Sequence, residues 1–128
     1  MIDIESTVFD RIAKAFDAAY PNGSRYGEAT ATPATFPCVT LVEADNYTYE
    51  QSPDEYAWLM YEVNVYSNKV SGAKQECKAV MDLVDNEMIA MGFARMFCNQ
   101  TKNSENQIYR MTARYRAVIS KEHRIYKK

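Results

Sequence analysis

The sequence predicts an α+β fold in which two helices pack on one face of a mostly antiparallel, mixed sheet. Three observations carry this prediction. Every second residue from Ala57 to Val65 is apolar, which is typical of a strand with one buried face. Residues 73–91 carry apolar side chains at the three-and-four spacing of a helix. The remaining strand patterns do not alternate strictly with helix patterns, which argues against a parallel sheet.

The length and composition are those of one ordinary globular domain. A chain of 128 residues is expected to fold as a single domain over 1–128, with residues from about 120 to 128 forming a basic tail that is mobile in the monomer. Apolar residues make up 47% of the chain and charged residues 25%. No apolar run approaches the ~20 residues of a membrane-spanning helix, and the acidic N-terminal region lacks the features of a signal peptide. We therefore expect that the protein does not associate with a membrane and that it assembles in a cytoplasm.

The first half of the chain predicts a helix followed by a strand. Asp3 is the expected N-cap of a helix that stops near Tyr20, because Pro21, Asn22 and Gly23 disfavour its continuation. Residues 24–37 are expected to form a loop with room for a short edge strand. The short, β-branched run 38–42 then predicts a buried strand.

Residues 43–55 contain five acids and no base. This segment is either a long hairpin arm or an acidic loop, and it serves either as a solvated connection or as a contact between subunits. Its acids and the tyrosines between them are Glu43, Asp45, Tyr47, Tyr49, Glu50, Asp54 and Glu55.

The second half predicts a helix and a hairpin. Ser71 is the expected N-cap of the second helix, and Gly92 is well placed to end it. Strands are predicted over 93–98 and 107–119, joined by a polar turn at 99–106.

No motif predicts catalysis, a cofactor or a metal. Cys38, Cys77 and Cys98 are widely spaced and accompany only one histidine, His123, so they support neither disulfides nor a zinc site and are expected to be buried free thiols. His123 is expected at the surface. The four glycines form no phosphate-binding motif. We therefore expect a protein that is not an enzyme.

Arg110, Arg114 and Arg116 fall on one face of the last predicted strand. Guanidinium groups cannot be buried unpaired, so they need carboxylates, phosphates or water. One interpretation is an ion pair with Glu62 on the neighbouring strand, and a second is a platform for single-stranded nucleic acid, although the net charge is −2. A third is self-assembly, because a closed ring needs two complementary patches on every subunit and residues 43–55 are acidic where the arginines are basic.

Three stretches of the chain resemble the tail terminator, or tail completion, proteins of long-tailed bacteriophages. They are Phe36-Pro37 leading into an apolar strand, the strand exit at 62–69 and the helical run at 76–86. Taken in their order along the chain, these stretches extend the resemblance to roughly residues 1–120. The resemblance implies a small α+β domain that assembles into a ring, usually a hexamer, at the head-proximal end of the tail tube.

The resemblance also implies a structural role in the virion, at the junction of tail and neck. The expected partners are further copies of the chain, the major tail tube protein and a neck or head completion protein, with DNA only as passing cargo and no cofactor. The alternatives are a small nucleic-acid-binding domain that uses the three arginines, or another head–tail connector such as a head completion protein. The candidate subunit interface comprises Glu43, Asp45, Tyr47, Tyr49, Glu50, Asp54, Glu55, Arg110, Arg114 and Arg116.

Overall fold

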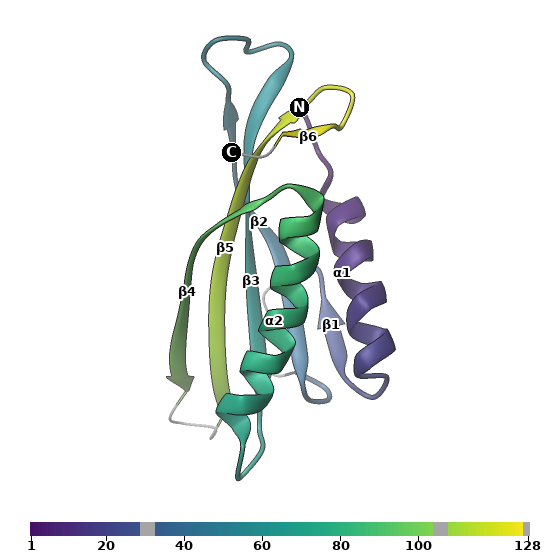
Figure 1. Ribbon diagram of the computed structural model, residues 1–128, viewed down its shortest axis with the longest axis vertical. Helices are drawn as coiled ribbons and strands as arrows, with labels where there is room; N and C mark the ends of the chain where they lie inside the picture. The colour runs from purple at the N-terminus through teal and green to yellow at the C-terminus, as the bar shows by residue number, and fades with distance from the viewer. Residues whose placement is uncertain (29–32, 104–107, 127–128) are drawn as a thin grey trace.

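Two helices cover one face of a curved sheet (Figure 1) in the computed structural model, which describes residues 1–28, 33–103 and 108–126. The predicted α+β class is confirmed. In chain order, the described elements are α1 (Glu5–Ala19), β1 (Ser24–Tyr26), β2 (Cys38–Thr48), β3 (Tyr56–Ser67), α2 (Ala73–Met91), β4 (Ala94–Asn103), β5 (Ile108–Ser120) and β6 (Ile125–Tyr126).

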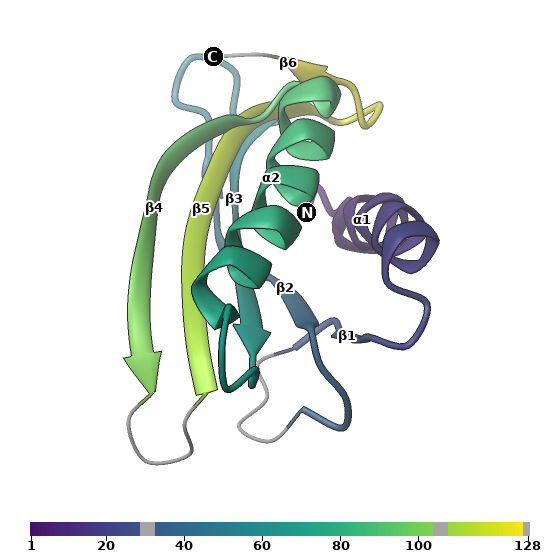
Figure 2. The same ribbon diagram turned by 60° about the horizontal axis from the view of Figure 1, so that its bottom comes forward.

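The sheet is mixed, as predicted, and its strand order is β1-β2-β3-β5-β4. Only the pairing of β1 with β2 is parallel, whereas β2–β3, β3–β5 and β4–β5 are antiparallel. β6 pairs with Val118 and Ile119 of β5, so the predicted basic tail forms a short strand up to Tyr126. Residues 127–128 lie outside the described part of the chain. Figure 2 shows both helices on the same side of the sheet, which leaves the other face without a helix.

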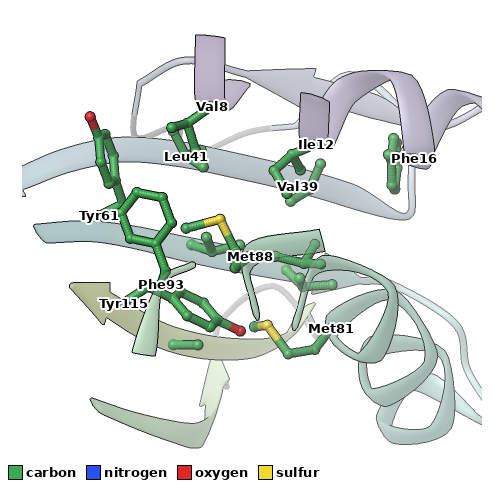
Figure 3. Close-up of a cluster of buried hydrophobic side chains, with 14 of the residues drawn as sticks. Val8, Ile12, Phe16, Val39, Leu41, Tyr61, Met81, Met88, Phe93 and Tyr115 are labelled. Carbon is green, nitrogen blue, oxygen red and sulfur yellow. The ribbon is translucent and has the colours of Figure 1, made fainter. Parts of the chain in front are cut away.

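The core lies between the helices and the odd-numbered residues of the two central strands. α1 places Val8 and Ile12 over Leu41 and Val39 of β2, while α2 contributes methionines beside the aromatic side chains of the core (Figure 3). Burying each large apolar side chain contributes roughly 1.5–3 kcal/mol. The buried residues of β3 and β5 on this face are Ala57, Leu59, Tyr61, Val63, Val65, Met111, Ala113, Tyr115, Ala117 and Ile119.

Asp85 of α2 links the helix to two strands. It accepts a hydrogen bond of 2.8 Å from the Tyr115 hydroxyl of β5 and forms an ion pair of 3.2 Å with Arg95 of β4. Burial, and then the hydrogen bond to Asp85, raise the pKa of Tyr115 above its usual range, so the phenol remains a donor. This contact fixes the start of β4 to the body of the protein.

The helix ends differ from two of the predictions. α1 begins one residue later than expected, with Ile4 at the N-cap position, although the Asp3 carboxylate still accepts a hydrogen bond of 2.9 Å from the Glu5 amide. Ser71 is not the N-cap of α2, because Gly72 holds that position with a φ of 88°. Gly92, with a φ of 114°, ends α2 as predicted, in a left-handed conformation that favours glycine.

The strands are longer than the sequence predicts. The strand expected at 38–42 continues to Thr48, past a β-bulge between Glu43 and Asp45, so the acidic segment is a hairpin arm in which residues 43–48 are strand and residues 49–55 form the connection to β3. The strand expected at 93–98 runs from Ala94 to Asn103, and part of the predicted turn at 99–106 is therefore strand. Residues 104–106 of that turn lie outside the described residues. β1 is the short edge strand for which residues 24–37 had room.

We predict that Gly23→Ala destabilises the fold by roughly 1–3 kcal/mol, the usual cost of overpacking. An added Cβ would lie 2.6 Å from Cζ of Phe16 and 2.7 Å from the backbone oxygen of Pro37. Urea unfolding followed by circular dichroism measures the change. Gly27→Ala is the matched control, because its Cβ would have no heavy atom within 4 Å. Equal stability of the two variants would contradict the prediction.

Candidate functional site

The hairpin of β2 and β3 extends beyond the ends of the helices and carries the acidic segment (Figure 1). We call residues 43–55 the acidic arm. Its acids Asp45, Glu50, Asp54 and Glu55 are exposed. In the described part of the chain, none of these four forms an ion pair with a basic side chain. The arm therefore presents uncompensated negative charge to the solvent.

Aromatic rings line the face of the arm that is turned away from the helices. The ring centroids of Tyr47 and Tyr49 lie 6.2 Å and 6.1 Å, respectively, from that of Trp58. The Tyr49 ring centroid also lies 5.8 Å from that of Tyr56. The guanidinium of Arg116 lies 4.9 Å from the Trp58 ring centroid. These contacts give the acidic arm a large and defined surface at its base.

Glu43 differs from the other acids of the arm because it lies half-buried at the arm's foot, next to α1. The Glu43 amide donates a hydrogen bond of 2.7 Å to the carboxylate of Glu5. Burial, followed by the nearby charges of Glu5 and Asp3, raises the pKa of the Glu43 carboxyl. Oε1 of Glu43 is buried without a hydrogen-bond partner in the described residues, so Glu43 is less available to another subunit than the exposed acids of the arm.

The predicted ion pair across the sheet is confirmed for one arginine. Arg114 contacts Oε1 of Glu62 at 3.0 Å through both Nε and Nη2, and its guanidinium lies 6.0 Å from the ring centroid of Phe97. The Arg114 side chain is still 40% exposed, so it can accept a further partner. Arg110 keeps a buried Nε without a hydrogen-bond partner in the described residues.

The structure does not gather the ten predicted interface residues into one site. Arg116 lies across from Met60, near the base of the acidic arm, whereas Arg110 lies across from Tyr66 at the other end of β3. Arg114 stands between them, beside the outermost strand β4. The acidic arm and the arginine face are therefore neighbouring surfaces and not one continuous patch.

The sequence interpretation missed the exposed side chains of β4. Met96 and Phe97 are 44% and 37% exposed. Cys98 is also exposed, which corrects the prediction of three buried thiols, while Cys38 and Cys77 are buried. Burial and the neighbouring Glu76 raise the pKa of Cys77 to about 12, so this thiol is unreactive at neutral pH. The polar run at 99–103 directly after Cys98 was the available sign of an edge strand.

The described residues contain neither a cluster of three potential metal ligands nor a helix that could span a membrane. Within 1–28, 33–103 and 108–126, histidine, cysteine and acidic side chains form no group of three or more that could hold a metal ion. Among the same residues, neither helix is sufficiently long and apolar to cross a bilayer. His123 is exposed, as expected, in the turn before β6.

We predict that Glu43→Gln stabilises the protein at neutral pH. A carboxyl whose pKa is raised on folding binds more protons in the folded than in the unfolded state between the two pKa values, so stability falls as the pH rises through that window. The loss of stability is complete above the pKa that Glu43 has in the folded protein and absent below the pKa that it has in the unfolded protein. Glutamine removes this cost, because it carries no charge.

Urea unfolding at pH 7 and again near pH 3.5 measures the effect of Glu43→Gln. The gain in unfolding free energy is expected at the higher pH and is expected to shrink at the lower one. Asp54→Asn, at the exposed tip of the arm, changes the net charge equally and serves as the control. A gain of the same size at both pH values, or in both variants, would show that Glu43 is not the cause.

Comparison with known proteins shows a similar fold in a virus-like particle. No protein-family model and no curated protein matches the sequence significantly. Among solved structures, a chain of the "Virion of native gene transfer agent (GTA) particle" superimposes with a TM-score of 0.74, over 91% of this chain and 94% of that one. The two sequences are 14% identical, so the comparison shows that the chains share a fold.

Proposed function

We propose that this chain is a structural protein of a phage-like virion. In this proposal it forms a ring at the head-proximal end of a tail tube, ends polymerisation of the tail and joins the tail to the head or neck. The observation that carries the proposal is the shared fold, over almost the whole of both chains, with a chain of a gene transfer agent virion. The resemblance of residues 36–37, 62–69 and 76–86 to tail terminator proteins supports the more specific role.

The proposed mechanism is geometric, and no covalent bond is made or broken. One face of the ring would match the end of the tube and prevent the addition of further tube subunits. The opposite face would present a surface to the neck. A closed ring of identical subunits needs two different patches on each subunit, since every copy meets one neighbour on each side.

The acidic arm is the first of these patches in the proposal. Its exposed carboxylates lack basic partners within the described subunit, and Arg114 of a neighbouring copy is sufficiently exposed to provide one. Charge complementarity of this kind guides the approach and register of two surfaces. Tyr47 and Trp58 provide aromatic area that would be buried at the contact, which is where most binding energy arises.

The rival function is binding of single-stranded nucleic acid on the helix-free face of the sheet. Two observations favour it, namely the stacking of Arg116 on Trp58 and of Arg114 near Phe97, because bases stack on surfaces of this kind. Light scattering after size exclusion separates the two proposals, together with a titration of single-stranded DNA at several salt concentrations. A monomer that binds DNA in a salt-dependent manner would favour the rival. A head completion protein is a neighbouring alternative that would also form a ring.

Electron microscopy of the purified protein, alone and mixed with tail tube protein, tests the ring directly. We expect closed rings of uniform diameter. A protein that remains monomeric in both preparations, even at high protein concentration, would refute the proposal.

We predict that charge reversal on the acidic arm weakens the ring. The double variant Glu50→Lys with Asp54→Lys changes two exposed residues without known intramolecular partners, so folding should be unaffected. Loss of two attractions, each worth up to about 1 kcal/mol, predicts a fall in association of roughly tenfold or more at low salt, and a smaller fall at high salt. Light scattering over a dilution series measures this change.

The matched control carries Asp10→Lys and Asp82→Lys, which alter the net charge equally on the exposed surfaces of α1 and α2. The control is expected to assemble like the parent protein. Equal weakening of both double variants would assign the effect to total charge and not to the arm.

A further inference from the structure

In the described part of the chain, one edge of the sheet is open. β4 pairs with β5 on one side, and no described strand pairs with its other side. Its residues Arg95–Gln100 are exposed. Among the described residues, no side chain accepts a hydrogen bond from a β4 amide in that stretch. A long strand with free amides is a ready template for another strand.

The opposite edge is closed for half of its length. The lower part of β2 is covered by β1, which pairs with residues 38–40, and the Glu43 amide is taken by the Glu5 carboxylate at 2.7 Å. Above Glu43 the strand enters the acidic arm, where no described strand pairs with its outer side, although the Asn46 side chain donates a hydrogen bond of 2.8 Å to the Ile2 backbone oxygen. There the Asn46 backbone amide donates a hydrogen bond of 2.8 Å to the adjacent, exposed Asp45 carboxylate, which a backbone carbonyl can replace.

The register shows which amides of β4 point outward. The Tyr49 amide donates a hydrogen bond to the Tyr56 carbonyl. The backbone N–H and C=O groups of even-numbered residues of β3 therefore point toward β2, and those of odd-numbered residues point toward β5. Because odd-numbered residues of β3 pair with odd-numbered residues of β5, the backbone N–H and C=O groups of even-numbered residues of β5 point toward β4. One of these residues, Thr112, is opposite Asn99. Asn99 therefore bonds inward, and the amides of Cys98 and Gln100 point to the open edge.

We infer that the open edge of β4 in one copy pairs with the open outer edge of β2 in the acidic arm of the next copy, so that the sheet continues between subunits. This inference rests on the proposed ring and names its second patch. It supplies two unlike surfaces that fit one another, as a closed ring of identical subunits requires. Strand addition also gives the outward amides of Cys98 and Gln100 carbonyl partners.

Charge selects this pairing over the alternatives. Residues 93–103 contain two bases, Arg95 and Lys102, and no acid, whereas the acidic arm contains five acids and no base. Arg114 stands next to Phe97 of β4 and adds to the positive side. Two copies joined through β4 alone would bring like charges together, which is unfavourable between neighbouring strands. Head-to-tail pairing brings opposite charges together.

Proline at position 100 tests the edge without breaking the sheet inside the subunit. Gln100→Pro removes an outward amide and leaves the inward bonds of Asn99 intact, and the extended backbone before it suits proline. We expect association to fall about tenfold or more, the equivalent of one or two lost hydrogen bonds between subunits. Gln100→Ala is the matched control, because it also loses the contact with the Tyr109 hydroxyl but keeps the amide. Urea unfolding of both variants reports any loss of stability within the subunit.

Disulfide trapping tests the partner strand. Cys98 is exposed and lies opposite Ala113, on the helix-bearing face of the sheet. In the arm, Asn46 and Thr48 lie on the same face, opposite Leu59 and Ala57. A continuous sheet keeps side chains on their own face, so Asn46→Cys or Thr48→Cys should form a disulfide with Cys98 of the next copy under mild oxidation. The expected product is a ladder of oligomers on a non-reducing gel.

Tyr47→Cys is the control for trapping, since Tyr47 lies on the other face, opposite Trp58, and should give no ladder. Adding Cys98→Ser should abolish the ladders of the other two variants. Rings that Gln100→Pro leaves unchanged, equal trapping at Tyr47→Cys, or dimers joined through Cys98 of both copies would each overturn the edge pairing while leaving the ring itself in place. A chain that never assembles would instead overturn the proposed function together with this inference.

Discussion

The structure depends on the alternation of side chains along the paired central strands β3 and β5. Their odd-numbered residues are buried under α1 and α2, and their even-numbered residues form the face without a helix. A shift of one residue would exchange the two sets and place Glu62 and Arg114 in the core. The register is thus fixed by the cost of burying these charges as much as by the gain from burying Tyr61 and Tyr115.

The central elements were predictable because one local pattern dominates each of them. The alternation at 57–65 and the helical spacing at 73–91 both correspond to β3 and α2, and Glu62 was correctly matched with an arginine across the sheet. The outer strands were harder to predict. The upper part of β2 and the second half of β4 are rich in polar residues, so they lack the period-two signal of a half-buried strand, and pairing with β3 and β5 makes them strands.

The candidate site was predictable in its charges and not in its arrangement. The acids at 43–55 and the arginines of β5 are evident in the sequence, but the half-buried position of Glu43 depends on α1, which folds against it from the start of the chain. The stacking of Arg116 on Trp58 likewise depends on the register between β3 and β5. Contacts between distant segments decide which charges remain available to a partner.

The link from Asp85 to Tyr115 and Arg95 has a mechanical consequence for the outermost strand. Asp85 connects the beginning of β4 to α2 through its ion pair with Arg95. Residues 97–100 are held by backbone pairing with β5 and by the contact between Gln100 and Tyr109. A pulling force on this strand would therefore meet unequal resistance at its two ends. Separation of β4 from β5 would therefore begin more easily at the Gln100 end than at the Arg95 end, where the ion pair with Asp85 adds to the backbone hydrogen bonds.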